Sequence, residues 1–187
     1  MRILETPRLL LVPVEEKDLM NLLDLQWDRE VVKYMKFTPL SLENQKEWLK
    51  TLGKNSLAFT MYHKNGDTKE FIGLATLNNI DHVNQRASWG MKLKTNIQSK
   101  GLGFEASLLI IHYAFNFLNM NKIHADYIEE NVSSKKLTEK IGLRKEGLLV
   151  KHLYQNGEFR NLILVGILKE EFYSHNNEML HQFEIID

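Results

Sequence analysis

Residues 98–106 read Gln-Ser-Lys-Gly-Leu-Gly-Phe-Glu-Ala and carry the strongest structural signal in this chain of 187 residues. They follow a strand-like alternation over residues 86–94 and open an apolar run over residues 104–118, which predicts a strand, a glycine loop and a helix in that order. The first N–H groups of a helix lack intrahelical partners, and the helix dipole adds positive potential there. Gly101 and Gly103 have no Cβ, so a phosphate can approach the backbone closely. The stretch predicts a site for a ligand that carries a pyrophosphate.

Two known loop types fit this stretch. Residues 101–106 match G-x-G-x-x-A, the dinucleotide-binding fingerprint, and Asp126 lies at about the right distance downstream to bind a ribose. That fingerprint sits in a tight turn directly after the first strand, whereas residues 95–100 intervene here, and too little chain remains for a second nucleotide-binding half. The other fit is Q/R-x-x-G-x-G/A, with Gln98, Gly101 and Gly103 at its fixed positions. Each motif is weak when taken alone.

Three other segments carry further motifs in a fixed order. Residues 131–143 read Asn-Val-Ser-Ser-Lys-Lys-Leu-Thr-Glu-Lys-Ile-Gly-Leu, close to N-x-x-S-x-x-L-Y-E-K-x-G-F. Residues 146–161 follow an EG…NGxYxx pattern, and residues 5–11 read Glu-Thr-Pro-Arg-Leu-Leu-Leu. With the loop, these motifs resemble the GNAT superfamily of acetyl-CoA-dependent N-acetyltransferases. The branch they resemble holds ribosomal-protein N-terminal acetyltransferases, spermidine acetyltransferases and related amino-sugar enzymes. The resemblance covers about residues 5–173, and the ordered set is far more specific than any one motif.

Composition predicts one ordinary globular domain over residues 1–187, with a core over about 5–173 and a C-terminal tail over 174–187. The 43% apolar and 26% charged fractions are typical of soluble proteins, and this length buries a core without disulfides. No apolar run is long enough for a membrane span, and the first residues do not resemble a signal peptide. Zero cysteines exclude a disulfide framework and a cysteine nucleophile. A cytoplasmic location is expected.

The distribution of charge and the spacing of the histidines limit the ligands and partners that the sequence predicts. The net charge is zero, which argues against a broad nucleic-acid surface. The seven histidines form no ligand-like pair, so no metal site is expected. Acids gather in residues 15–30 and bases in residues 132–145, which would suit a cationic acceptor and the 3′-phosphate of CoA respectively. Ordinary solvated helix faces are the commoner explanation for both clusters.

Periodicity predicts an α/β domain whose mixed, mostly antiparallel central sheet is flanked by helices, the fold that the resemblance implies. Strands are expected over residues 8–14, 58–63, 71–78, 86–94, 122–129, 143–152 and 158–168. Helices are expected over residues 15–27, 41–52, 104–118 and 133–141. Asn65-Gly66 and Asn156-Gly157 predict hairpin turns, and Gly142 is expected to cap a helix. The segment from Glu170 shows no clear pattern.

The resemblance implies a path for acetyl-CoA. In the family, the strand before the loop splays from its neighbour and holds the pantetheine arm with its backbone; the matching residues are Met91, Lys92 and Leu93. The pyrophosphate would bind the loop residues Gln98, Ser99, Lys100, Gly101, Leu102 and Gly103. Asn131 would order the channel, Ser134 would reach toward the thioester sulfur, and Lys136 and Lys140 would add positive charge. Asn131 and Ser134 are also favoured helix caps, so a structural role stays open for both.

Acetyl transfer from a thioester to an amine needs a neutral amine, a donor for the oxyanion and a proton for the thiolate. It needs no covalent intermediate, which suits a chain without cysteine or a G-x-S-x-G motif. Two positions depart from the family: Thr138 replaces the usual tyrosine acid, and Ser88 replaces a frequent glutamate. The candidate acids are Ser134, Tyr127, Tyr154 and water, and the candidate bases are Glu129, Glu130 and Glu158. Among these, Ser134, Glu129 and Tyr154 are the predicted catalytic residues.

The sequence is compatible with three kinds of amine as the acetyl acceptor: a polyamine, a protein N-terminus and an amino sugar. The acidic run over residues 15–30 favours a polyamine, whereas an α-amine titrates near 8 and needs little help from a base. A small-molecule or peptide amine is therefore the expected partner, and a homodimer is allowed for. Two alternatives belong to other classes: a non-catalytic CoA-binding regulatory domain and a nucleotide-dependent oxidoreductase.

Overall fold

The computed structural model describes residues 4–35, 40–97 and 100–185, and it is built around a sheet in the order β1-β2-β3-β4-β5-β6-β8-β7. Neighbouring strands are antiparallel except β5 and β6, which are parallel, so the predicted mixed and mostly antiparallel sheet is confirmed. The strands are β1 (Leu4–Glu5), β2 (Leu9–Pro13), β3 (Leu57–Asn65), β4 (Thr68–Asp81), β5 (Arg86–Leu93), β6 (Lys122–Ile128), β7 (Arg144–Gln155) and β8 (Glu158–Leu168).

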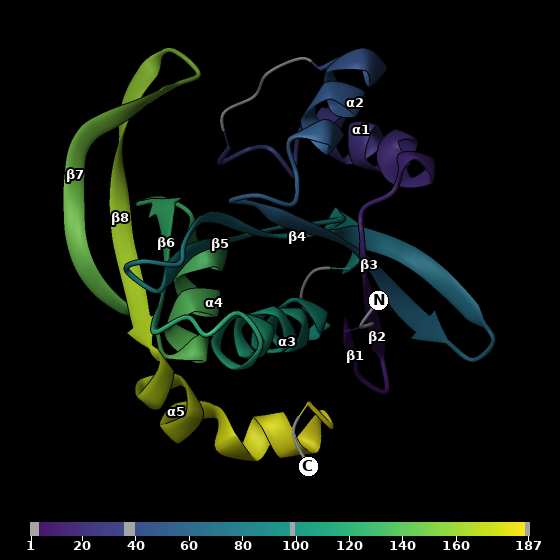
Figure 1. Ribbon diagram of the computed structural model, residues 1–187. Helices are drawn as coiled ribbons and strands as arrows, with labels where there is room; N and C mark the ends of the chain where they lie inside the picture. The colour runs from purple at the N-terminus through teal and green to yellow at the C-terminus, as the bar shows by residue number, and fades with distance from the viewer. Residues whose placement is uncertain (1–3, 36–39, 98–99, 186–187) are drawn as a thin grey trace.

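Helices cover both faces of the sheet (Figure 1). On one face lie α1 (Leu19–Trp27), preceded by the 3-10 turn η1 (Glu16–Asp18), and α2 (Leu42–Lys50). On the other lie α3 (Leu102–Asn116), α4 (Val132–Ile141) and α5 (Lys169–Gln182), and η2 (Thr95–Ile97) leads from β5 toward α3. Two separate cores result, one between the sheet and α3 with α5, the other between the sheet and α1 with α2. None of the helices in the described residues is long and apolar enough to cross a membrane.

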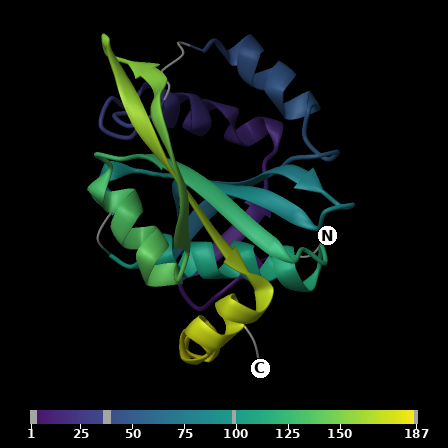
Figure 2. The same ribbon diagram turned by 90° about the vertical axis from the view of Figure 1, so that its left-hand side faces the viewer.

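The C-terminal helix α5 corrects the expectation of an unpatterned tail after Glu170. Figure 2 shows it beneath the sheet, crossing the end of the layer that α3 and α4 form. In α5, the Phe172 side chain is fully buried. The side-chain amide of Asn176 is also buried, and it donates to the Ile141 carbonyl at the end of α4, 2.9 Å away. Most of this helix's stability comes from such tertiary contacts, because its sequence carries only a weak amphipathic pattern.

The parallel strands β5 and β6 pair only over their first residues. Their register ends at Ser88↔His124, whereas β5 continues to pair with β4 as far as Leu93 and β6 continues to pair with β8 as far as Ile128. The two strands therefore part beyond this point, and we call the space between residues 89–93 and 125–128 the β5–β6 gap. The edge of β5 that faces the gap presents backbone N–H and C=O groups without ladder partners.

Candidate active site

Gly101 caps the N-terminus of α3 beside the β5–β6 gap. Its φ is 79°, in the left-handed region, and its carbonyl accepts the first helical bond from the Glu105 N–H at 3.1 Å. Among the described residues, a Cβ added at Gly101 would meet one heavy atom within 4 Å, Arg8 Nη2 at 3.8 Å. Glycine is thus favoured here by backbone conformation, and the N–H groups of the first helical turn suit an anion.

At position 103, glycine is favoured for a different reason, the close packing of α3 against β5. A Cβ there would lie 2.7 Å from Leu93 Cδ1 and 3.8 Å from Met91 Cε, both on β5. The residue therefore lets α3 pack closely against the strand that borders the gap, in addition to any part it plays for a phosphate. Leu102 between the two glycines is buried in the core at 1% exposure, so only its backbone can serve a ligand.

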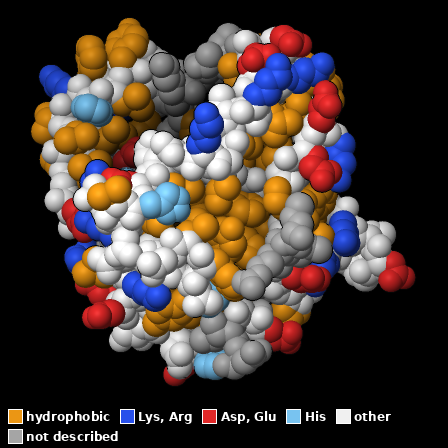
Figure 3. Space-filling view, in the orientation of Figure 1, with side chains coloured by type: hydrophobic (Ala, Val, Ile, Leu, Met, Phe, Trp, Pro, Cys, Tyr) orange, Lys and Arg blue, Asp and Glu red, His pale blue; other side chains and the backbone are white. Residues whose placement is uncertain are grey.

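The predicted loop has three further residues. Gln98 and Ser99 lie outside the described residues. Lys100 is exposed at the start of α3. In Figure 3, hydrophobic side chains gather in the middle of this face, where β5, α3 and α4 converge in Figure 1.

Helix α4 borders the same region. The Asn131 side chain accepts a hydrogen bond from the Ser134 N–H at 3.0 Å, so it caps the helix, as expected for this residue type. Ser134 is half-buried, and its carbonyl accepts a hydrogen bond from Thr138 Oγ1 at 2.9 Å. Lys136 is exposed, and Lys140 Nζ lies 4.2 Å from the ring centroid of Phe104 in the first turn of α3. The structure thus brings Lys140 to the helix end at which the pyrophosphate was predicted.

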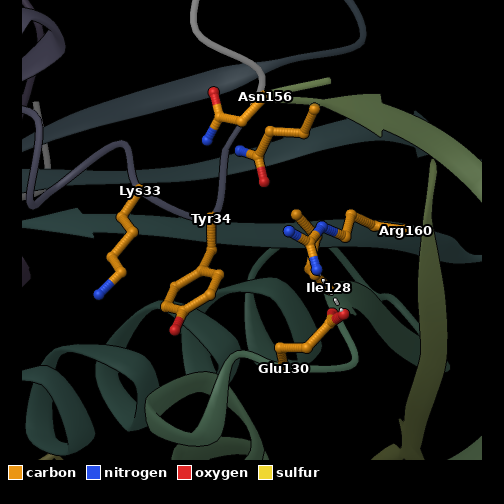
Figure 4. Close-up of a pocket in the computed structure, with 7 residues that line it drawn as sticks. Lys33, Tyr34, Ile128, Glu130, Asn156 and Arg160 are labelled. Atoms are coloured by element: carbon orange, nitrogen blue, oxygen red, sulfur yellow. Dashed lines mark hydrogen bonds and ion pairs between the residues drawn. The ribbon is translucent and has the colours of Figure 1, made fainter. Parts of the chain in front are cut away.

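A cavity of about 250 Å³ lies where the end of β6, the chain after α1 and the β7–β8 hairpin meet. In Figure 4, Lys33 and Tyr34 lie on one side of it and Glu130 and Arg160 on the other. Figure 3 shows the hollow between the hairpin and the α1–α2 layer. The cavity is lined by Lys33, Tyr34, Ile128, Glu130, Gln155, Asn156 and Arg160.

Polar bonds across this cavity tie its walls together. Arg160 Nη1 lies 3.0 Å from Glu130 Oε1, and its Nη2 lies 2.8 Å from Glu158 Oε2. Gln155 Nε2 donates to the Met35 carbonyl at 2.5 Å, which joins the hairpin to the chain after α1. Sequence reasoning missed Lys33, Gln155 and Arg160 as site residues. Alternation along the hairpin could have grouped Gln155 with Arg160, because both face the same side of it.

The predicted catalytic residues occupy different environments. Glu129 is exposed and accepts a hydrogen bond from Asn161 Nδ2 at 2.8 Å, and it does not line the cavity. Tyr154 is 61% exposed and packs edge-on against Phe159, on the opposite face of the hairpin from Gln155. Ser134 is thus the only one of the three that lies on a helix bordering the gap.

Tyr127 is better placed than Tyr154 to act as an acid near Thr138. It lies on β6, half-buried, and its hydroxyl is near enough to the Thr138 side chain for that side chain to influence its pKa. Burial raises the pKa of the Tyr127 hydroxyl, and the nearby Thr138 side chain offsets part of this shift. Thr138, which stands where the family motif has a tyrosine, is itself only 4% exposed.

The acidic run over residues 15–30 does not form one continuous rim. Asp18 is buried and accepts a hydrogen bond from the Tyr62 hydroxyl at 2.7 Å. Asp28 accepts from the Glu30 N–H at 2.9 Å, and Glu15 pairs with Lys17 at 2.5 Å. Several of these acids therefore have local structural partners.

Lys92 on β5 is turned toward α1, where its ammonium group donates to Gln26 Oε1. Burial lowers the pKa of Lys92. Its backbone carbonyl points toward β4, where Lys92 is paired with Leu74, so the groups on the open edge of β5 belong to the alternate residues Met91 and Leu93. Within the described ranges, no cluster of three or more His, Asp or Glu side chains could hold a metal ion.

Comparisons with known proteins agree with this geometry. Residues 8–144 match the family model of the acetyltransferase (GNAT) domain. The chain is 34% identical to the uncharacterized N-acetyltransferase p20 of Bacillus licheniformis, over 92% of this chain and 99% of that protein. It is 31% identical to the spermidine N(1)-acetyltransferase of Escherichia coli K12, over 57% of this chain and 58% of that protein. It is also 31% identical to the [ribosomal protein uS5]-alanine N-acetyltransferase of the same strain, over 54% of this chain and 53% of that protein.

One solved structure shows the same fold. The spermidine N-acetyltransferase of Vibrio cholerae, in complex with CoA and spermine, superposes with a TM-score of 0.82 at 24% identity, covering 88% of this chain and 98% of that chain. The family model alone spans more than half of the residues, and p20 is matched along nearly its whole length. The parted parallel strands, the glycine-capped helix and these matches lead to one conclusion: the chain belongs to the GNAT acetyltransferase family.

Proposed function

We propose that this acetyltransferase moves an acetyl group directly from acetyl-CoA to the N-terminal amine of a peptide or protein. The observation that carries the proposal is the β5–β6 gap, which opens beside the glycine-capped end of α3 on one side and near the cavity of about 250 Å³ on the other. A thioester in the gap and an amine in the cavity would meet without a covalent enzyme intermediate, and much of the acceleration would come from that positioning.

The residues around the gap fit acetyl-CoA, which supplies the activated acetyl group. The unpaired backbone edge of β5 over residues 89–93 offers donors and acceptors to the amides of the pantetheine arm. The N–H groups at the start of α3, with Lys100 and Lys140 nearby, suit the negative diphosphate.

Charge in the cavity favours a peptide amine over a polyamine. Lys33 places a cation at the cavity, and the single carboxylate of the lining, Glu130, is already paired with Arg160, which also pairs with Glu158. A polycation would need several unpaired carboxylates, whereas a peptide N-terminus brings one amine and amide groups that match Gln155 and Asn156. Its α-amine titrates near 8, so an appreciable fraction is neutral without a strong base, as suits a site with Ser88.

Spermidine is the second candidate, because spermidine acetyltransferases stand among the relatives and the ending over residues 156–161 resembles theirs. Ser134 and Tyr127 are the proposed proton donors to the departing thiolate. Glu129 remains a predicted base, and Glu130 is the carboxylate that lies at the cavity. The cytoplasmic location and the homodimer also remain predictions.

A panel of acceptors tests the proposal. An Ala- or Ser-initiated peptide, spermidine and a 4-amino sugar would be assayed for thiol release from acetyl-CoA at low and high salt. We expect the peptide to have the highest kcat/KM. A spermidine kcat/KM that exceeds it and falls steeply with salt would refute the peptide acceptor, because screening weakens attraction between exposed charges.

The variant Lys33→Gln sharpens this comparison. It removes a cation from the cavity wall, so it should raise kcat/KM for spermidine and leave kcat/KM for the peptide within about 3-fold of the unaltered value.

Calorimetric titration with acetyl-CoA, CoA and NADH distinguishes this function from the two other classes of protein. Binding of NADH instead of acetyl-CoA would support a nucleotide-dependent oxidoreductase. Binding of acetyl-CoA without turnover of any amine would support a non-catalytic regulatory domain.

A further inference from the structure

We propose that Arg8, held in place by Glu105 and Phe183, is a cationic contact for the diphosphate of CoA, so that the two ends of the chain complete the cofactor site. None of these three residues occupies a fixed position of the Q/R-x-x-G-x-G/A motif. The inference rests on acetyl-CoA as co-substrate, but it is independent of the acceptor. It begins with a buried charge next to the glycine loop.

Glu105 lies in the first turn of α3, and its side chain is 0% exposed. Its carboxylate accepts hydrogen bonds from the Thr6 hydroxyl, from Arg8 Nη2 and from Arg8 Nε, the last at 2.8 Å. A buried carboxylate is stable only when it is paired and hydrogen-bonded, and the helix N-terminus adds to its stabilisation. Glu105 therefore fixes the Arg8 guanidinium at the start of α3.

Arg8 has donors left over after this pairing. A guanidinium carries five N–H donors in a rigid fork, and Glu105 engages the Nε–H and one hydrogen of Nη2. The Arg8 side chain remains 45% exposed, and its Nη2 lies 3.8 Å from the point that a Cβ of Gly101 would occupy. The outer side of the fork thus lies beside Gly101 at the N-terminus of α3. A planar fork of this kind suits bidentate binding of phosphate oxygens.

The C-terminal end of α5 holds Arg8 from the other side. The Phe183 ring centroid lies 5.8 Å from Arg8 Cζ, and the ring packs edge-on against Phe104 at a centroid distance of 6.3 Å. Lys140 Nζ lies over Phe104. Two cations, Arg8 and Lys140, therefore flank one aromatic pair at the N-terminus of α3, where the helix dipole also favours an anion.

Two hypotheses account for Arg8: it stabilises Glu105 alone, or it also offers its outer N–H groups to the diphosphate. Pairing with Glu105 engages only the inner edge of the guanidinium, which leaves the outer edge beside Gly101 for a ligand. The two hypotheses predict different effects of removing each charge. If Arg8 binds the diphosphate, Glu105→Gln keeps a side-chain oxygen that can accept from Arg8 and removes a negative charge, so the attraction for phosphate is kept or strengthened.

The test is calorimetric binding of CoA and of pantetheine, which lacks the phosphates, to the full chain. Arg8→Gln/Glu105→Gln removes both charges and keeps hydrogen-bonding groups. We expect it to weaken CoA binding about 10-fold and to leave pantetheine unchanged. Glu105→Gln alone should bind CoA at least as tightly as the unaltered protein. The matched control Arg144→Gln/Glu171→Gln removes another Arg–Glu pair, the one that joins β7 to α5, and should change CoA affinity less than about 2-fold.

The proposal fails if the folded Arg8→Gln/Glu105→Gln variant binds CoA with unaltered affinity, or if CoA and pantetheine lose affinity in parallel, which would indicate a distorted loop. If that variant does not fold, Phe183→Leu decides: it should weaken CoA about 3-fold and leave pantetheine unchanged, and equal CoA affinity overturns the proposal. Intact CoA binding without turnover of the peptide would count against the proposed acceptor alone.

Discussion

Replacing Tyr127 with phenylalanine tests how this enzyme protonates its leaving thiolate without the tyrosine that Thr138 replaces. The last paired residues of β5 and β6 are Ser88 and His124. Met91 and Tyr127 each follow three residues later, so they lie at the same level on the two sides of the β5–β6 gap. Tyr127 lies near the Thr138 side chain, and burial raises the pKa of its hydroxyl. A phenol in this state stays protonated at neutral pH and can donate to a thiolate in the gap.

The expected loss follows from the chemistry of the leaving group. General acids contribute about 10²- to 10⁴-fold, and a thiol with a pKa near 8.5 leaves tolerably well unaided, so the low end applies. We expect Tyr127→Phe to lower kcat about 10²-fold, equivalent to about 2.7 kcal/mol in the barrier. Affinity for acetyl-CoA should change less than about 3-fold, and loss of the hydroxyl should lower the free energy of unfolding by about 1 kcal/mol.

The assay is kcat as a function of pH, with Tyr154→Phe as the control that makes the same chemical change at an exposed phenol. The acid works while protonated and is lost as pH rises through its pKa. Because that pKa is raised, kcat should climb until the acceptor amine is neutral and stay level to about pH 10. A Tyr127→Phe variant within about 3-fold of the unaltered kcat would refute the assignment. A fall in kcat between about pH 8 and 10 that Tyr154→Phe abolishes would give the role to Tyr154.

Three further predictions concern the loop, the C-terminal helix and a buried histidine. Gly101→Ala should lower the free energy of unfolding by about 1 kcal/mol in denaturant titrations, because φ is 79°. Gly101→Glu should also abolish acetyl-CoA binding in a folded protein, and retained affinity would contradict the loop assignment. Asn176→Ala should cost about 2–3 kcal/mol, because its buried amide donates to two backbone carbonyls, whereas the exposed neighbour substitution Asn177→Ala should cost less than about 0.5 kcal/mol. Burial lowers the pKa of His112, so its contribution to stability is present above pH ~6.5 and is lost as pH falls below that value. Stability curves of the native protein and of His112→Gln that stay parallel between about pH 7.5 and 5.5 would contradict this.

Local patterns in the sequence predicted much of the fold, including the strand, glycine and helix at which the cofactor is proposed to bind. The strand before Gly101 and the helix after it follow from alternation and from an apolar run, because both periods are set by backbone geometry. Asn131 and Gly142 cap α4 as expected, since side-chain oxygens and left-handed glycines satisfy helix ends locally. The order of the motifs identified the family before any contact was known. Gln98 and Ser99, also predicted for this site, lie outside the described residues.

The remaining features depend on segments that are distant in the sequence. Helix α5 lacks a strong pattern of its own and forms because α3 and α4 offer it buried contacts and an open carbonyl to bind. The cavity combines the chain after α1, the end of β6 and the β7–β8 hairpin, so no local period could group Lys33 with Arg160. Arg8 and Glu105 are 97 residues apart in the sequence. The packing of β1 and β2 beside α3 brings the half-exposed guanidinium into contact with the buried carboxylate. Caps and periods depend on neighbours within about four residues, whereas cavities and buried ion pairs depend on the closure of long loops, which sequence spacing does not encode.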